Sequence, residues 1–410
     1  MMRSNQLLLL FCLLTIFGCK KNEITIPPIN PDENLSNTQP ISGAVMKGME
    51  GIYTLSSGSN SLGEQFVCKV SRYKVSFFSN KEGIFMILKY GLKSSDGSIQ
   101  FSGFWRYSEK KDQGNIQFSI SAGNGASDLL NGIINQLKIT GVNSGNDMQL
   151  TYQRHFSATA INKGFMIMAH HGVQTTSDPP YAENSLLGVL NDEDYGVTGM
   201  EFDVRMTKDH VPICVHDATI DTRLTLKGPL SGNWDQYSFN LISSYITLID
   251  GQKVPSVEQV LNKFIDSTNL TYMWLDIKGN TDIFKYLEPV IRRAYARAAA
   301  QNRKVVLFAG LPSADVIDEL HKQPSYADLP TLCEQSVDLA IENGSKFYGP
   351  RFTEGLVLDA VKKAHSNGIK VISWTLNDKA LIKNYLQNGQ FDGFISDYPA
   401  YVVYDFYTLF

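Results

Sequence analysis

The sequence has no excess of charge of one sign and only a short apolar run near its N-terminus. Its 410 residues contain 37 Lys and Arg against 41 Asp and Glu, a formal net charge of −4, without a long basic stripe. Because nucleic-acid binding needs many basic side chains to displace phosphate counterions, this balance argues against nucleic acid as a partner. The apolar run, residues 7–17, is shorter than the roughly 20 residues that span a bilayer.

Cysteine is also scarce, with five residues in the whole sequence. No Cys and His residues combine at the spacing of a zinc site. Cys68, Cys214 and Cys333 each lie in an apolar, strand-like run, and no two of them are close in sequence. This distribution predicts buried free thiols and not a disulfide framework.

Residues 1–18 are predicted to be a lipoprotein signal peptide. Arg3 supplies a positive start, the apolar run follows, and the segment ends in Ile16-Phe17-Gly18-Cys19. This ending resembles the lipobox of bacterial lipoproteins, in which the cysteine is lipidated and becomes the first residue of the mature chain. We therefore expect a lipid anchor at Cys19 and a location in the bacterial cell envelope, facing the periplasm or the cell exterior. A plain secretory signal with a chance cysteine is the alternative.

Composition divides the next part of the chain into a tether and a β-rich domain. Residues 19–40 are polar and rich in proline, which predicts a flexible tether. Residues 41–156 contain short alternating runs separated by Gly, Asn and Ser, which predicts an all-β sandwich or barrel of about eight strands. The clearest predicted strands are 65–70, 73–78, 84–90, 99–107 and 115–121, and a short helix is predicted over 128–137. The role of this domain is open.

Residues 162–410 change to a repeated pattern of strand, loop and helix. Helices are most clearly predicted over 283–300 and 355–366. The eight predicted strands are 164–169, 199–204, 271–277, 304–308, 329–333, 346–349, 370–375 and 392–396. Their number and the length of the segment match a (β/α)8 barrel, so the predicted fold class is α/β, a TIM barrel preceded by an all-β domain.

Polar residues gather where these strands end, which is where TIM-barrel active sites lie. They are His170 and His171 after the first strand, Glu201 and Asp203 on the second, His216 after an extended piece at 211–215, and Asp276 and Lys278 on the third. Carboxylates packed this closely repel one another unless a cation neutralises them. Oxygen ligands without cysteine favour one divalent cation, Mg²⁺ or Ca²⁺.

Such a set of groups suits cleavage of a phosphodiester. The cation and the lysine can stabilise the negative charge that develops on the phosphate. One imidazole can activate the nucleophile while the other protonates the leaving alkoxide, because the pKa of histidine is about 6.5.

An ordered series of motifs over about residues 164–399 resembles the glycerophosphodiester phosphodiesterase family. The first half of the series is His170-His171-Gly172, Glu183-Asn184-Ser185, Glu201-Phe202-Asp203-Val204, Thr207-Lys208-Asp209 and His216-Asp217. The second half is Val254-Pro255-Ser256, Leu275-Asp276-Ile277-Lys278, Ser373-Trp374-Thr375-Leu376-Asn377 and Ser396-Asp397-Tyr398-Pro399. The resemblance does not include the N-terminal β-rich domain.

The resemblance implies a role for each of these positions. His170 and His216 would be the catalytic acid/base pair, Glu201, Asp203 and Asp276 would bind the metal, Lys278 would bind the phosphate, and Trp374 would line the substrate side. Glu183 and Asn184 would shape a loop near the site. The family usually has Arg, which contacts the phosphate, at the position of His171, and Glu at that of Asp276. These two departures predict an altered substrate preference or weaker catalysis.

The resemblance implies an enzyme, a phosphoric diester hydrolase that converts a glycerophosphodiester to glycerol phosphate and an alcohol. Two alternatives stay open from the sequence. One is a phospholipid-cleaving lyase that releases a cyclic phosphate, and the other is a non-catalytic tethered phosphate-binding module. Because every candidate site residue follows Phe156, a chain that begins near Ala158 should contain the complete site.

Overall fold

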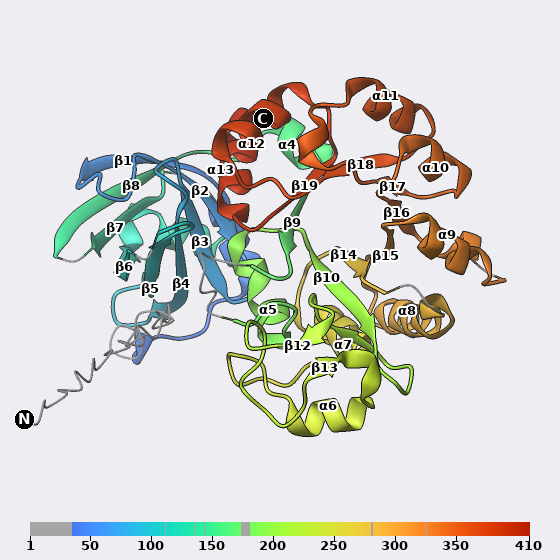
Figure 1. Cartoon of the computed structure of the whole chain (residues 1–410). Coiled ribbons are helices and arrows are strands. Elements are labelled where there is room, and N and C mark those ends of the chain that lie inside the picture. The colour runs from blue at the N-terminus through green and yellow to red at the C-terminus, as the bar shows by residue number, and fades with distance from the viewer. Residues whose placement is uncertain are drawn as a thin grey trace, which may run out of the picture.

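The computed structural model describes residues 35–110, 112–134, 136–143, 145–173, 181–279, 282–324 and 326–410. The predicted signal peptide, Cys19 and residues 19–34 of the predicted tether lie outside these residues. Two barrels stand side by side, the N-terminal one built from β1–β8 and the second from β9 onward (Figure 1). Of the described helices, none is long and apolar enough to cross a membrane.

The N-terminal unit is a closed antiparallel barrel, which decides between the sandwich and the barrel that the sequence left open. Each strand pairs with the next, and β1 pairs with β8. The strands are β1 (Gly51–Gly58), β2 (Gln65–Val70), β3 (Lys74–Ser79), β4 (Ile84–Lys93), β5 (Ser98–Tyr107), β6 (Gln113–Ile120), β7 (Lys138–Asn143) and β8 (Asn146–Arg154). Buried side chains such as Phe66, Phe77, Phe101 and Phe118 form the core of this barrel.

The helix predicted over 128–137 is wrong in its position and length. The structure has a short helix, α3 (Ala126–Leu130), which ends before Asn131. Gly132 has a φ of +75°, a left-handed conformation that an α-helix cannot continue through, so the chain turns there toward β7.

The second unit is a barrel of eight parallel strands, and all eight predicted strands are present in it. The strands are β9 (Met166–His170), β10 (Gly199–Met206), β14 (Tyr272–Ile277), β15 (Val306–Leu311), β16 (Thr331–Cys333), β17 (Phe347–Tyr348), β18 (Lys370–Ser373) and β19 (Gly393–Ser396). β19 and β10 both pair with β9, which closes the barrel. β11 (Pro212–Cys214) adds an antiparallel pairing to β10, and β12 (Thr219–Ile220) pairs with β13 (Gly232–Asn233).

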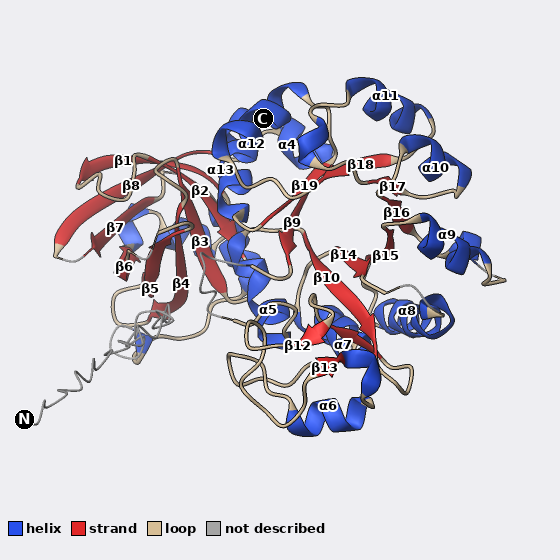
Figure 2. Ribbon diagram, viewed as in Figure 1, coloured by secondary structure: helices blue, strands red, loops and turns tan. Residues whose placement is uncertain are grey.

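Helices follow the parallel strands and surround the barrel (Figure 2). The predicted helix over 283–300 is confirmed, and the one predicted over 355–366 begins later, at Leu358. The α-helices are α2 (Gly43–Met46), α3, α4 (Ala158–Lys163), α5 (Leu186–Asn191), α6 (Phe239–Tyr245), α7 (Val257–Ser267), α8 (Ile283–Ala300), α9 (Ala314–His321), α10 (Val337–Glu342), α11 (Leu358–Ser366), α12 (Lys379–Asn388) and α13 (Pro399–Leu409). Short 3-10 helices are η1 (Lys47–Met49), η2 (Ala122–Asn124), η3 (Asp192–Tyr195), η4 (Trp234–Gln236), η5 (Tyr326–Asp328) and η6 (Phe352–Glu354).

The strand register brings the candidate residues into neighbouring rows at one end of the parallel barrel. Glu201 on β10 is the Cα partner of His170 on β9 and of Trp274 on β14. Two residues further along, Asp203 is the partner of Asp276. Because side chains alternate along a strand, Glu201 and Asp203 point to the same face of β10.

The two barrels share one hydrophobic contact surface. Helix α13 contacts β2 and β3 as well as β9 and β19, and it lies between the barrels in Figure 1. The outward-facing Phe85 ring of β4 meets the Tyr195 ring of η3 edge-on, with centroids 5.1 Å apart. Lys74 of β3 forms an ion pair of 2.5 Å with Asp194 of η3.

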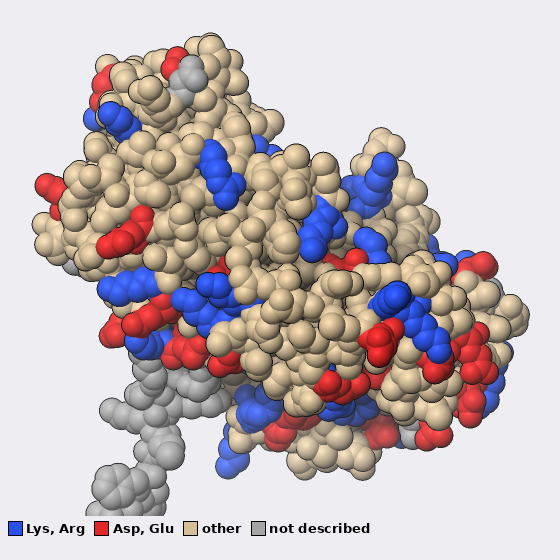
Figure 3. Space-filling view, turned by 90° about the horizontal axis from the view of Figure 1, so that it is seen from above, with Lys and Arg blue, Asp and Glu red and all other residues tan. Residues whose placement is uncertain are grey.

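On the face shown in Figure 3, acidic and basic side chains are interspersed.

We expect Phe85→Ala to lower the free energy of unfolding by about 3–5 kcal/mol, because the Phe85 side chain is fully buried against the second barrel. Denaturant unfolding would measure the change. Tyr73→Ala is the matched control, since Tyr73 is on the same barrel and 68% exposed. An equal loss in both variants would contradict a stabilising contact between the barrels.

Candidate active site

The candidate residues meet at the C-terminal ends of the parallel strands, as the sequence predicts. A cavity of about 250 Å³ opens there, lined by His170, His171, Glu183, His216, Asp217, Arg223 and Asp397. Glu201 and Asp203 on β10 and Asp276 on β14 are more deeply buried, and Lys278, which follows β14 directly, is 25% exposed. The structure thus brings together all seven of the predicted catalytic, metal and phosphate residues.

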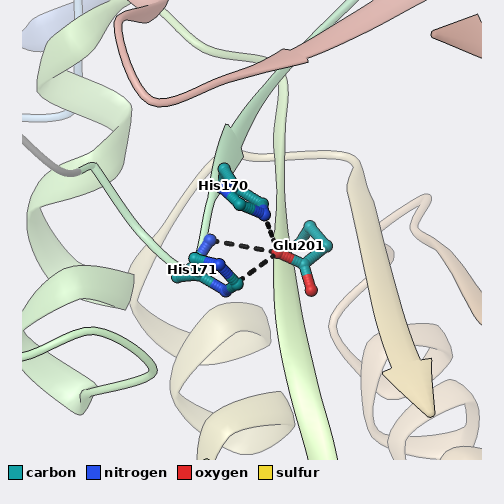
Figure 4. A group of neighbouring side chains, drawn as sticks. All are labelled: His170, His171 and Glu201. Atoms are coloured by element: carbon teal, nitrogen blue, oxygen red, sulfur yellow. Dashed lines mark hydrogen bonds and ion pairs between the residues drawn. The ribbon is translucent and has the colours of Figure 1, made fainter. Parts of the chain in front are cut away.

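His170 ends β9 and is held by a carboxylate from the last strand. Its Nδ1 lies 2.6 Å from Asp397 Oδ1, and Asn377 Nδ2 donates to the other oxygen of Asp397 over 2.7 Å. The second ring nitrogen, Nε2, is directed at Glu201, 3.9 Å away (Figure 4). Burial lowers the pKa of His170, and the charge of His171 lowers it further against the opposing effect of Asp397. The contact between Nδ1 and Asp397 orients the imidazole ring and leaves Nε2 available for proton transfer.

His216 follows β11 and also has an aspartate on its Nδ1, at 2.9 Å from Asp217 Oδ1. Arg223 Nε donates to the second oxygen of Asp217 over 2.7 Å, which lowers the pKa of Asp217 well below its usual range. The same guanidinium binds both oxygens of Glu183, at 2.7 and 2.8 Å. Glu183, Arg223 and Asp217 therefore form a chain of charged groups that fixes His216 from the side of the loop.

Glu201, Asp203 and Asp276 are buried and each offers an oxygen to one group of atoms that lie within 4.8 Å of one another. Burial and the charge of Asp203 raise the pKa of Glu201 well above its usual range. Burial would raise the pKa of Asp203 too, but the charge of His171 lowers it overall. Among the described residues, Glu201 Oε1 has no hydrogen-bond partner. A buried carboxylate oxygen without a partner, beside two further carboxylates, fits a divalent cation with oxygen ligands.

His171 adds a positive charge to these carboxylates. Its Nδ1 lies 2.6 Å from Asp203 Oδ2 and 3.4 Å from Glu201 Oε2, and its backbone N–H donates to the same Glu201 oxygen. Burial opposes the charge, but Asp203 and Glu201 together raise the pKa of His171 to about 10. His171 also belongs to two further candidate ligand groups, one with His170 and Glu201 and the other with Asp203 and His216. Its predicted contact with phosphate stays a prediction.

Asn184 and Lys278 hold the same carboxylates from two sides. Asn184 Nδ2 donates to Asp203 Oδ2 over 2.7 Å, and the Asn184 backbone N–H donates to the carbonyl of His171 over 2.8 Å. Lys278 Nζ lies 2.5 Å from Asp276 Oδ2 and 3.2 Å from Asp203 Oδ1. Burial would lower the pKa of Lys278, but these carboxylates raise it, so the lysine is charged. Asn184 is thus a positioning residue, in agreement with the predicted loop-shaping role.

Trp374, which is predicted to line the substrate side, follows β18 directly. Its Nε1 donates to the carbonyl of Gly349 over 2.7 Å, and the guanidinium of Arg351 covers its ring at 4.6 Å. The ring meets Trp274 of β14 edge-on, with centroids 6.0 Å apart. These contacts fix the Trp374 ring, and its contact with substrate stays a prediction.

Sequence reasoning missed three charged residues at this end of the barrel. Arg205 of β10 donates to the backbone carbonyls of His216 and Lys278, at 2.8 and 2.7 Å. Arg223 fixes Asp217, as described above. Glu334 follows β16 directly, and burial together with the charge of Asp276 raises its pKa to about 8. Of these three residues, only Glu334 could have been identified from the sequence, because it comes directly after the predicted strand 329–333.

The buried thiols agree with the sequence. Cys68, Cys214 and Cys333 are free and buried, so no disulfide links the described cysteines.

Comparisons with known proteins match the parallel barrel. The model of the family described as "Glycerophosphoryl diester phosphodiesterase family" matches residues 170–401. An uncharacterized protein, YqiK, of Bacillus subtilis (strain 168) is 25% identical over 237 residues, which cover 57% of this chain and 95% of that protein. A glycerophosphodiester phosphodiesterase of Bacillus altitudinis is 22% identical over 243 residues, 57% of this chain and 94% of the relative.

Solved structures of other proteins are also similar to part of this chain. The crystal structure of a glycerophosphodiester phosphodiesterase from Parabacteroides distasonis ATCC 8503 has a TM-score of 0.49 and 20% identity. The match covers 60% of this chain and 97% of that chain.

We expect Glu201→Gln to weaken the binding of a divalent cation by at least about 100-fold while the fold is kept. The change removes charge at nearly constant shape, and altering even a residue outside the metal ligands typically costs about 10–100-fold in affinity. Calorimetric titration of chelator-treated protein with Mg²⁺ or Ca²⁺ would measure the loss, and Glu342→Gln at an exposed position is the control. Unchanged affinity in Glu201→Gln would remove Glu201 from the cation site.

Proposed function

The chain belongs to the glycerophosphoryl diester phosphodiesterase family, and we propose that it hydrolyses glycerophosphodiesters to glycerol phosphate and an alcohol with His170 and His216 as the acid/base pair. The observation that carries this proposal is the pairing of two Asp-bound imidazoles with a group of buried carboxylates and a lysine. Two histidines with carboxylates on Nδ1 present their Nε2 atoms for proton transfer.

The three carboxylates and Lys278 support binding of the phosphate between His170 and His216. Glu201, Asp203 and Asp276 would hold one divalent cation, which supplies positive charge to a bound phosphate oxygen. Lys278 is charged and adjacent to two of these carboxylates, so it can bind a second phosphate oxygen. Because these positive groups are fixed before the reaction, they can stabilise the charge that develops on the phosphate without reorganising.

The two histidines divide the proton transfers. One imidazole accepts the proton of the attacking water, and the other donates a proton to the oxygen of the leaving alcohol. Asp397 and Asp217 each stabilise the positive charge that their histidine carries during this exchange. The arrangement is symmetric in its chemistry, so either histidine can serve as the acid.

We predict that His170→Ala and His216→Ala each lower kcat by about 10²- to 10⁴-fold with little loss of stability. If both act in one step, the double variant should be much less impaired than the product of the two single effects. The measurement is turnover of glycerophosphocholine with Mg²⁺ or Ca²⁺ restored after EDTA. His365→Ala, at a histidine on α11 remote from the site, is the control.

A substrate with a p-nitrophenyl leaving group should partly rescue the variant that lacks the general acid, because p-nitrophenolate leaves without a proton. Full activity in both single variants would overturn the acid/base assignment. A cyclic phosphate as the first product would contradict hydrolysis by water and favour the lyase alternative.

We also propose that the protein is attached to a membrane by a lipid on Cys19, on the basis of the sequence Ile16-Phe17-Gly18-Cys19. Cys19→Ala should move the protein from the membrane fraction to a soluble or uncleaved-precursor pool, measured by fractionation and immunoblotting. Cys12→Ala, inside the apolar run, is the matched control and should stay in the membrane fraction. Membrane association of Cys19→Ala that still requires detergent for release would count against this anchor.

A further inference from the structure

The turn that follows β9 has an unusual backbone conformation. His171 has a φ of +56° and Gly172 a φ of +81°, so two consecutive residues are left-handed. This conformation is unfavourable for a residue with a side chain, and it persists only where the surrounding structure fixes it. His170 directly precedes the turn and His171 is part of it, so the contacts that fix the turn also determine where both imidazoles lie.

Three hydrogen bonds hold the backbone of this turn, and one of them comes from a residue outside the site described above. The His171 N–H donates to Glu201 Oε2 over 3.1 Å (Figure 4). The His171 carbonyl accepts from the Asn184 N–H over 2.8 Å. The third is donated by the Val173 N–H to Asp192 Oδ1 over 2.9 Å. Asp192 belongs to η3 and does not line the active-site cavity.

The Asp192 carboxyl group is buried directly beneath the turn. Its side chain is 0% exposed, and a Cβ on Gly172 would lie 3.7 Å from each of its two oxygens. Burial raises the pKa of Asp192 to about 8, against the hydrogen bond from Val173 and together with the charge of Asp194. Burying a carboxyl group is costly unless it makes hydrogen bonds. Asp192 Oδ2 has no partner among the described residues, so the contact that compensates this burial is the one with the turn.

The N-terminal barrel holds η3 from the other side. Asp194, two residues after Asp192, pairs with Lys74 Nζ over 2.5 Å and accepts a hydrogen bond of 2.6 Å from Ser71 Oγ. Lys74 begins β3, and Ser71 directly follows β2. Because a 3-10 helix has three residues per turn, residues two apart in η3 point to different sides. Asp194 therefore faces the barrel while Asp192 faces the turn.

Apolar packing fixes η3 against the same two strands of the N-terminal barrel. η3 contacts β3 and β4, and the Tyr195 ring meets Phe85 of β4 as described above. Gly196 ends η3 with a φ of +74°, and a Cβ there would lie 3.0 Å from the Phe78 ring of β3. A close-packed contact of this kind transmits a displacement from one side to the other. A continuous path of contacts thus leads from the N-terminal barrel through η3 to the turn.

We propose that Asp192 is a positioning residue for the turn that carries His171, and that the N-terminal barrel fixes Asp192 through the Lys74–Asp194 ion pair. The barrel then belongs to the catalytic unit, although it contributes no group to the reaction. The expected effect on turnover rests on the proposed phosphodiesterase function, whereas the effect on the turn itself does not.

A pair of substitutions at position 192 tests the hydrogen bond. Asp192→Asn keeps an oxygen acceptor for the Val173 N–H at nearly constant shape, and Asp192→Ala removes it. We expect Asp192→Ala to lower kcat for glycerophosphocholine by about 10–100-fold with a change in KM below about 3-fold, because the imidazoles are displaced relative to the phosphate. Asp192→Asn should retain most of kcat. Equal losses in the two variants would overturn the role of Asp192 as the acceptor.

Two lysines of the N-terminal barrel offer a matched test of its part in this path. Lys74→Met removes the ion pair with Asp194. Lys69→Met makes the same change elsewhere between the barrels, where Lys69 Nζ donates to the Tyr407 hydroxyl of α13 over 3.3 Å. We expect kcat to fall by about 10-fold in Lys74→Met and to stay unchanged in Lys69→Met. Equal kcat in Lys74→Met and Lys69→Met would overturn the link between the barrel and the turn.

Hydrogen–deuterium exchange at the Val173 amide separates this proposal from the proposed function, because it needs no turnover. In the full chain, exchange should become about 10-fold faster or more in Asp192→Ala and Lys74→Met, as the turn opens more often. It should stay at the wild-type rate in Asp192→Asn and Lys69→Met. This pattern supports the positioning role even if no phosphodiester is hydrolysed, whereas a wild-type rate in Asp192→Ala would overturn it.

Discussion

The repulsion among Glu201, Asp203 and Asp276 is the constraint on which the rest of the site depends. Three buried carboxylates cannot all be charged unless positive groups lie against them. In the described structure His171 and Lys278 supply two positive charges, and the unpaired oxygen of Glu201 leaves a place for a cation. The same electrostatic field that holds these side chains in place would act on a phosphate, so the stability of the folded site and its chemistry have one origin.

The barrel makes this arrangement possible because strand register fixes which residues meet. Asp203 and Asp276 are direct partners across β10 and β14, and His170 is the partner of Glu201. Side chains from the loops then hold the residues that the strands position. Arg223 lies in the loop between β12 and β13 and holds Asp217, while Asn184 connects the loop after β9 to Asp203. Strands thus set the charge cluster, and loops set the orientation of the histidines.

Much of this could be predicted from the sequence, and the failures have physical causes. The eight parallel strands were predictable because each is a short buried apolar run, and the residues that end them define the site. Closure of the N-terminal barrel depends on pairing between β1 and β8, which are distant in sequence and carry no local signal. Arg205 was missed because its partners are backbone carbonyls, whose positions no sequence pattern shows. The helix predicted over 128–137 is shorter in the structure because the left-handed backbone at Gly132 ends it, although the apolar pattern continues.

The two departures from the family pattern act on opposite sides of the carboxylates, and their effects differ. Histidine in place of arginine at position 171 keeps a positive charge at neutral pH, since Asp203 and Glu201 raise the pKa of His171 to about 10. That departure changes the number and direction of hydrogen-bond donors more than it changes the charge. Aspartate in place of glutamate at position 276 shortens a side chain beside Gly310, where Glu334 provides a further carboxylate. In the proposed function, the first departure would therefore change how the phosphate is held, whereas the second shortens the carboxylate that pairs with Lys278.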